Sequence, residues 1–113
     1  MIQIYHNNRC TKSRECLAFL DDSGQEYEVI KYLEDIPTFD ELSSIIGKLR
    51  IKPIELVRQK EKAWIDNFKG KRMTDEEIVK AMIEYPILIE RPIVVNGEKA
   101  IIARPLEKAA SIL

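Results

Sequence analysis

Apolar positions along the chain change their spacing several times, and each change marks an expected element. Residues 2–5 are apolar and β-prone, which is typical of a strand. From Thr11 the apolar residues follow helical spacing as far as Ser23-Gly24, where glycine favours a helix end. Residues 27–32 favour a second strand. Together these elements form a βαβ unit, so we expect the two strands to be parallel.

Residues 38–85 show helical rather than strand patterning. Two capping-box sequences, at 38–41 and 74–77, precede apolar stripes and predict helix starts. Pro53 is expected to open a short helix, because proline suits the first helical position. The stretch 64–72 has weak periodicity and indicates a loop with at most a short turn. We therefore expect a helical block at about 38–85.

Strand spacing returns near the end of the chain. The β-prone runs 92–95 and 99–103 flank Asn96-Gly97, a strong hairpin signal because both residues tolerate positive φ. Pro105 is expected to open a last helix. The predicted order is β-α-β, helical insert, β-β-α, in an α/β chain whose residues 1–113 form a single domain without repeats or linkers.

Composition narrows the function classes. The chain has 113 residues, 45% hydrophobic and 33% charged, which is typical of a soluble globular protein. A net charge of -1 without a basic cluster argues against nucleic acid as a partner. No apolar run approaches the roughly 20 residues that span a bilayer, and no secretory leader is recognisable, so no membrane partner is expected. Two cysteines make no disulfide framework, and we expect a reducing, cytoplasmic location.

Cys10 is the strongest candidate for chemistry. It lies between the first predicted strand and the first predicted helix, where a thiol faces unpaired backbone N–H groups and the positive end of the helix dipole. Arg9, Lys12 and Arg14 add positive charge. Both effects favour thiolate, the nucleophilic form of cysteine.

Three arginines lie at element boundaries: Arg58 at the end of a short helix, Arg91 before the third strand and Arg104 after the fourth. Arg91 and Arg104 each precede a proline. A single arginine of this kind is most often an ordinary surface charge. Three guanidinium groups around one thiolate would bind a tetrahedral oxyanion, but spacing alone does not bring them together.

The remaining polar candidates have weaker signals. Cys16 follows Cys10 by six residues, about 9 Å along a helix and beyond disulfide reach, so it is either a resolving thiol or, as we favour, a buried apolar residue. His6 is the only histidine, which makes a metal site unexpected, and a structural role near the cysteine loop is favoured. The Ser13 hydroxyl could donate to the Cys10 thiolate or to the first turn of its own helix.

Two familiar cysteine motifs are absent. A phosphatase loop needs arginine six residues after the cysteine, and that position holds Cys16. A Cys-x-x-Cys pair is excluded because Ser13 occupies its second position. A disulfide cycle at Cys10 would therefore need an external thiol.

Taken together, several blocks resemble the glutaredoxin-linked arsenate reductase family over nearly the whole chain. They are Tyr5-His6-Asn7-x-x-Cys10-x-x-Ser13-Arg14, Tyr32-Leu33-Glu34 with Pro37-Thr38, Leu56-Val57-Arg58, Pro86-Ile87-Leu88-Ile89-x-Arg91-Pro92-Ile93-Val94-Val95, and Arg104-Pro105. The resemblance implies a thioredoxin-like fold with a mixed four-stranded sheet and a helical insertion. It also implies that Pro92 is a cis-proline facing the cysteine.

The resemblance implies a mechanism as well. Cys10 would attack arsenate, or a similar oxyanion, held by Arg58, Arg91 and Arg104. Glutathione would serve as co-substrate, glutaredoxin would complete the reduction to arsenite, and no bound cofactor would be needed. His6 and Ser13 would keep the thiolate hydrogen-bonded.

The chain departs from well-known members in two places: Asn8 replaces a proline, and Thr11-Lys12 replaces a Gly-Thr pair. Two other functions therefore stay open. One is a redox-responsive regulator of the Spx type that binds RNA polymerase, which ranks second because Ser13 breaks the usual cysteine pair. The other is a general glutathione-dependent thiol reductase.

Overall fold

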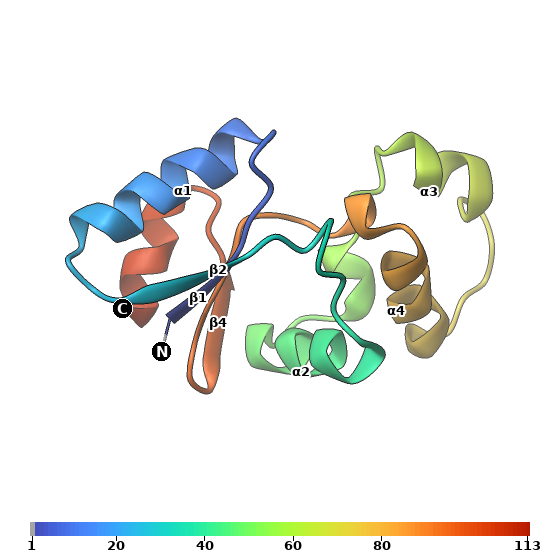
Figure 1. Cartoon of the computed structure of the whole chain (residues 1–113). Coiled ribbons are helices and arrows are strands. Elements are labelled where there is room, and N and C mark those ends of the chain that lie inside the picture. The colour runs from blue at the N-terminus through green and yellow to red at the C-terminus, as the bar shows by residue number, and fades with distance from the viewer. Residues whose placement is uncertain (1) are drawn as a thin grey trace. The chain divides into compact units, whose positions relative to one another are not determined.

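A computed structural model describes residues 2–113, and the chain divides into two compact units. The first unit contains residues 2–35 and 91–113, and the second contains residues 36–90. The second unit is made of helices and includes the predicted helical insert (Figure 1). The prediction of a single domain stays a prediction.

The first unit is built on a four-stranded sheet. Its strands are β1 (Ile2–Tyr5), β2 (Tyr27–Ile30), β3 (Ile93–Asn96) and β4 (Lys99–Ile102), in the order β2-β1-β3-β4. β1 pairs with β2 in parallel, while β3 runs antiparallel to both β1 and β4. The sheet is therefore mixed, and the parallel pair predicted from the βαβ pattern is present.

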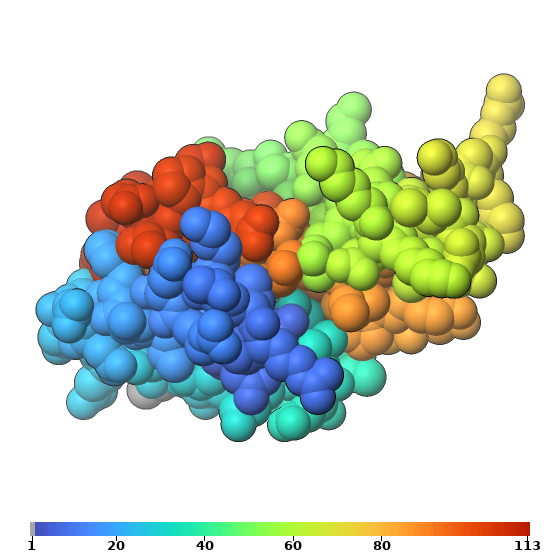
Figure 2. All heavy atoms as spheres, turned by 90° about the horizontal axis from the view of Figure 1, so that it is seen from above, coloured from blue at the N-terminus to red at the C-terminus, as the bar shows by residue number. Residues whose placement is uncertain are grey.

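Two helices cover one face of this sheet. They are α1 (Thr11–Asp22) and a C-terminal 3-10 helix, η3 (Leu106–Ile112), which lie against each other in Figures 1 and 2. Between them and the sheet lies a core of buried side chains that α1 supplies at helical spacing and the strands supply from alternate positions. The core residues are Ile2, Ile4, Cys16, Leu20, Val94, Ala103 and Ala109.

The second unit contains α2 (Phe39–Leu49), η1 (Pro53–Leu56), α3 (Lys62–Asn67), α4 (Asp75–Glu84) and η2 (Pro86–Leu88). Both predicted capping boxes are formed: Thr38 accepts from the backbone N–H of Glu41 at 3.1 Å, and Thr74 accepts from that of Glu77 at 3.2 Å. Each box satisfies donors that a helix start leaves unpaired.

The structure corrects several local predictions. Residues 62–67 form a helix where a loop was expected, and this helix has no side-chain cap to announce it. The hairpin turns at Gly97-Glu98 rather than Asn96-Gly97, since Asn96 pairs with Lys99 and only Gly97 has positive φ. Elsewhere, the helix after Pro53 ends at Leu56, two residues before Arg58, and the last helix is of the 3-10 type.

Candidate active site

Cys10 is the N-cap of α1, at the end of the loop that follows β1. Its backbone is extended, its N–H donates to the carbonyl of Asn7 at 2.9 Å, and its carbonyl accepts the first helical bond from Arg14. Only 8% of the residue is exposed. The thiol therefore occupies the place where Ser or Asp usually caps a helix, with the free N–H groups of the first turn in front of it.

Two of the three predicted arginines lie beside this sulfur. Nε of Arg91 donates to Sγ of Cys10 at 3.2 Å, and Nη2 of Arg104 lies 3.9 Å from the same atom. Nε of Arg104 also donates to the backbone carbonyl of Arg91 at 2.8 Å. The two guanidinium groups are therefore held next to each other at the thiol, by contacts within the sheet unit.

The β3–β4 hairpin explains how these arginines meet. Arg91 precedes β3 and Arg104 follows β4, so the antiparallel pairing of the two strands returns the chain to the same edge of the sheet. The N–H of Ala103 donates to the carbonyl of Pro92 at 2.9 Å and continues that pairing. The Arg91-Pro92 bond is cis, as the resemblance implies, and the Arg104-Pro105 bond is cis as well.

The electrostatics at Cys10 favour thiolate. Burial raises the pKa of the Cys10 thiol, but the backbone N–H of Ser13, the Arg91 guanidinium and the backbone N–H of Lys12 outweigh burial and lower the pKa to about 7. A substantial fraction of the thiol is therefore ionised at neutral pH. Such a group can act as a nucleophile without a separate general base.

Ser13 and His6 are both buried, and both lie near the cysteine loop. The Ser13 hydroxyl has no hydrogen-bond partner among residues 2–113, so the contribution of Ser13 to the thiolate comes from its backbone N–H instead. Burial, followed by the charge of Lys31, lowers the pKa of the His6 imidazole. His6 is therefore neutral at neutral pH, and no hydrogen bond joins its side chain to Cys10 in the described chain.

Arg58 belongs to the helical unit. Its guanidinium forms a 2.8 Å ion pair with Glu61 and donates to the carbonyl of Ile87 at 3.3 Å. Its backbone N–H donates to the carbonyl of Leu88, next to a bridge between Val57 and Ile89. Arg58 is thus firmly positioned within its own unit, and its part in oxyanion binding stays a prediction.

Cys16 is fully buried in the core between α1 and the sheet, and burial raises the pKa of its thiol to about 11. Both cysteines are free. These observations support the interpretation of Cys16 as a packing residue, because a neutral, inaccessible thiol is a poor nucleophile.

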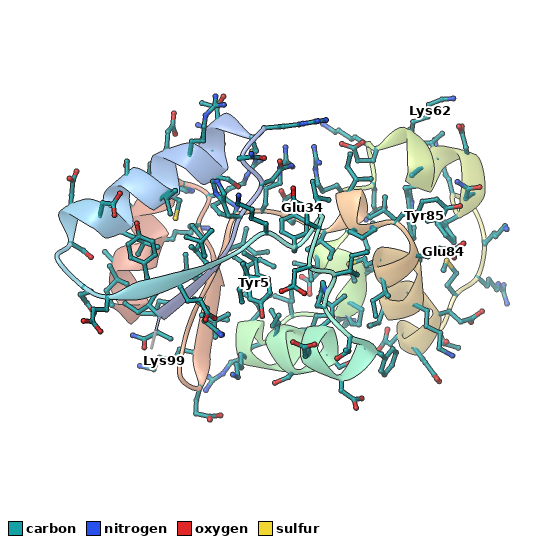
Figure 3. The ribbon with its side chains drawn as sticks, in the orientation of Figure 1. Tyr5, Glu34, Lys62, Glu84, Tyr85 and Lys99 are labelled. Atoms are coloured by element: carbon teal, nitrogen blue, oxygen red, sulfur yellow. The ribbon has the colours of Figure 1, made fainter. Side chains whose placement is uncertain are left out.

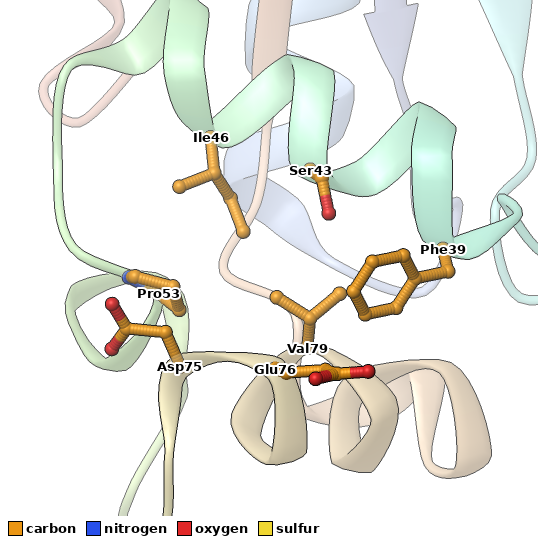
Figure 4. Close-up of a pocket in the computed structure, with 7 residues that line it drawn as sticks. All are labelled: Phe39, Ser43, Ile46, Pro53, Asp75, Glu76 and Val79. Carbon is orange, nitrogen blue, oxygen red and sulfur yellow. The ribbon is translucent and has the colours of Figure 1, made fainter.

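The helical unit contains a separate, mainly apolar cavity of about 360 Å³ between α2 and α4 (Figure 4). Phe39, Ile46 and Val79 supply much of its wall. Ser43, Pro53, Asp75 and Glu76 complete the lining, which contains no cysteine or histidine. Over residues 2–113 no cluster of potential metal ligands occurs, and no helix is long and apolar enough to cross a membrane.

Residues 5–112 match the sequence model of the ArsC family. The chain belongs to the ArsC family. It is 41% identical over 112 residues to the arsenate reductase of Haemophilus influenzae, covering 97% of each chain. It is 42% identical over 116 residues to the uncharacterised protein YfgD of Escherichia coli K12, covering 99% of this chain and 96% of that one.

Solved structures of ArsC relatives have the same fold. The arsenate reductase from Vibrio cholerae superposes with a TM-score of 0.94 at 40% identity, covering 99% of this chain and 97% of the other. This agreement and the sheet order confirm the predicted thioredoxin-like α/β fold with its mixed four-stranded sheet. The ArsC fold therefore places Cys10, Arg91 and Arg104 on one scaffold, at one edge of one sheet.

Proposed function

We propose that this chain reduces arsenate to arsenite, with Cys10 as the nucleophile. One observation carries the proposal: a buried thiol with a pKa of about 7 lies 3.2 Å from Nε of Arg91 and 3.9 Å from Nη2 of Arg104. A nucleophile paired with two guanidinium groups suits a substrate that is itself a tetrahedral oxyanion. Relatives named arsenate reductase, at 35–41% identity over nearly the whole chain, support the choice of oxyanion.

The arginines have two tasks in this reaction. They offset the repulsion between an anionic sulfur and an anionic substrate, and they stabilise charge that develops on the oxygens in the transition state. Arg91 is suited to both, because its guanidinium is a permanent cation that already pairs with the sulfur through Nε at 3.2 Å. Arg58 completes the proposed set of substrate-binding arginines, and Pro92, His6 and Ser13 are proposed as supporting residues.

In the first step, the Cys10 thiolate forms a bond to arsenic. One arsenic–oxygen bond breaks, and its oxygen leaves as water after protonation. Arsenic stays in the +5 state, since no electrons have been transferred. The covalent adduct between Cys10 and arsenic remains at the N-terminus of α1, where the backbone N–H groups of Lys12 and Ser13 face the sulfur.

The second and third steps use two further thiols. Glutathione forms a second sulfur–arsenic bond, and another water leaves. The thiolate of glutaredoxin then attacks the glutathione sulfur, a mixed disulfide forms, and the two electrons of the broken sulfur–arsenic bond reduce arsenic to the +3 state. Water finally displaces arsenite and regenerates Cys10. We propose the cytoplasm as the location, because both thiols belong to a reducing compartment.

Arsenite formation by the purified chain, with arsenate, glutathione and glutaredoxin, tests this proposal. We expect arsenite only when all components are present, and none with Cys10→Ser. If no arsenite forms while Cys10 is confirmed as reduced, the arsenate assignment is wrong. If arsenite forms without glutaredoxin, the reduction stands and the glutaredoxin step is rejected.

A further inference from the structure

A polar cavity of about 250 Å³ lies in the sheet unit, beside the loop that carries Cys10. One wall is the loop after β1 and the other is the loop after β2. These loops meet because β1 and β2 are parallel, which brings their carboxyl ends to the same edge of the sheet. Its lining residues are His6, Asn7, Asn8, Arg9, Lys31, Leu33 and Glu34.

Three local hydrogen bonds, two of which involve a side chain, hold the wall next to Cys10 in shape. The side-chain oxygen of Asn7 accepts from the N–H of Arg9 at 3.0 Å, and the Asn7 carbonyl accepts from that of Cys10 at 2.9 Å. Arg14 donates to the carbonyl of Asn8 at 3.2 Å. This wall is a closed turn before any ligand arrives, which reduces the entropy lost on binding.

The opposite wall is equally ordered. The carbonyl of Lys31 accepts from the N–H of Glu34 at 3.0 Å and from that of Asp35 at 2.8 Å. The N–H of His6 donates to the carbonyl of Ile30 at 2.8 Å and joins the two walls. Glu34 lies just past the end of β2, as Figure 3 shows. Lys31 and Glu34 are therefore fixed relative to the cysteine loop.

Three charged side chains line this cavity without an oppositely charged partner of their own among the described residues. The side chains of Arg9, Lys31 and Glu34 form no ion pair or hydrogen bond within residues 2–113. Lys31 lies close enough to His6 to lower the pKa of the imidazole, second only to burial. The cavity thus presents two cations and one carboxylate, which complement a ligand with two carboxylates and one ammonium group.

We propose that this cavity binds the charged ends of a small anionic thiol peptide, namely glutathione or a peptide of the same charge pattern. The inference rests on the proposed function, which requires such a thiol to reach arsenic on Cys10. The Asn7–Arg9 wall is followed directly by Cys10 in the chain. Arg9 lines the cavity and directly precedes Cys10 in the chain, so a peptide anchored at Lys31 and Arg9 binds beside the loop that carries the reacting sulfur.

Binding of S-methylglutathione, which cannot react, tests the site without turnover. We expect amide NMR shifts to change at residues 6–9 and 31–34, and Lys31→Ala to weaken binding up to about fivefold through the loss of one exposed charge pair. Lys99→Ala, on an exposed lysine of β4 outside the cavity, is the matched control and should leave the affinity unchanged. Equal affinity in both variants, or shifts confined to other residues, would overturn the proposal.

A second arm tests the orientation of the peptide. Glu34→Gln should weaken binding of S-methylglutathione but not of its N-acetylated form, which lacks the ammonium group. Inorganic phosphate should compete only weakly. If phosphate binds here as tightly as the peptide, the site is a general anion site and the proposal fails. Failure of the arsenite assay leaves these binding results intact, so the two failures are distinguishable.

Discussion

Arg91 donates a hydrogen bond from Nε to Sγ of Cys10 at 3.2 Å, although 81 positions separate the two residues in sequence. The pairing of β3 with β1 makes this contact possible, because it brings the start of β3 next to the end of β1. The thiolate is therefore paired with its main cation before substrate binds. An incoming oxyanion has to share this guanidinium with the sulfur.

The first prediction concerns the ionisation of Cys10. The rate of alkylation by iodoacetamide should rise with pH around a midpoint near 7, where the pKa of the thiol lies. Cys10→Ser should remove this phase, and Cys16→Ala should leave it intact, since burial raises the pKa of Cys16 to about 11. A midpoint above 8 in the folded protein would contradict the electrostatic picture of the site.

The second prediction compares how strongly Arg91 and Arg104 lower the pKa of Cys10. Arg91→Gln should move the alkylation midpoint upward, because the substitution removes both a hydrogen bond and a charge that lower the pKa of Cys10. Arg104→Gln should move it less, since Nη2 of Arg104 lies 3.9 Å from the sulfur. Lys108→Gln, on an exposed lysine of η3, serves as the control. An equal upward shift in all three variants would point to net charge instead of local contact.

Much of this arrangement could be predicted from the sequence, where the signals are local. The capping boxes that begin at Thr38 and Thr74 identify helix starts, because a few neighbouring side chains form them. The position of Cys10 before a helix follows from the change of apolar spacing at Thr11. By contrast, the helix at Lys62–Asn67 is short and uncapped, so nothing local announces it.

The site itself depends on non-local pairing. The sequence places Arg91 and Arg104 beside prolines at strand ends, but only the antiparallel hairpin brings both to Cys10. Ser13 is a different case, because its residue type draws attention to the hydroxyl while its backbone N–H faces the sulfur. The polar cavity was missed, although two parallel strands predict that the loops after them share one edge.

The third prediction links Cys10 to stability. Because the pKa of Cys10 is lower in the folded chain than the ordinary cysteine value of about 8.5, the unfolded state binds more protons between about pH 7 and pH 8.5. The stability of the wild type relative to Cys10→Ser should therefore increase as pH rises through this window, and the advantage should be lost as pH falls through 7. Urea unfolding at pH 6, 7, 8 and 9 measures the difference. A difference independent of pH would show that folding does not favour the thiolate.

The fourth prediction tests Arg58. Arg58→Lys should raise the KM for arsenate severalfold with little change in the alkylation of Cys10, because an ammonium group cannot reproduce the planar pair of donors. Glu61→Gln is the second variant to measure, since it removes the carboxylate charge that pairs with Arg58 at 2.8 Å. If Arg58 binds the oxyanion, this variant should lower the KM. Unchanged KM in both variants would restrict Arg58 to a structural role.

The last prediction concerns Cys16. Cys16→Ser should retain arsenite formation and lower the free energy of unfolding by about 1–3 kcal/mol, because a hydroxyl placed in this apolar core has to give up its water partners. Cys16→Ala should cost less, since it leaves a small void and no unsatisfied polar group. Denaturant unfolding and the arsenite assay, run on both variants, measure the two effects separately. A Cys16→Ala variant that folds normally but makes no arsenite would instead identify Cys16 as a resolving thiol. In that case the core around Cys16 would have to open during turnover to expose the thiol.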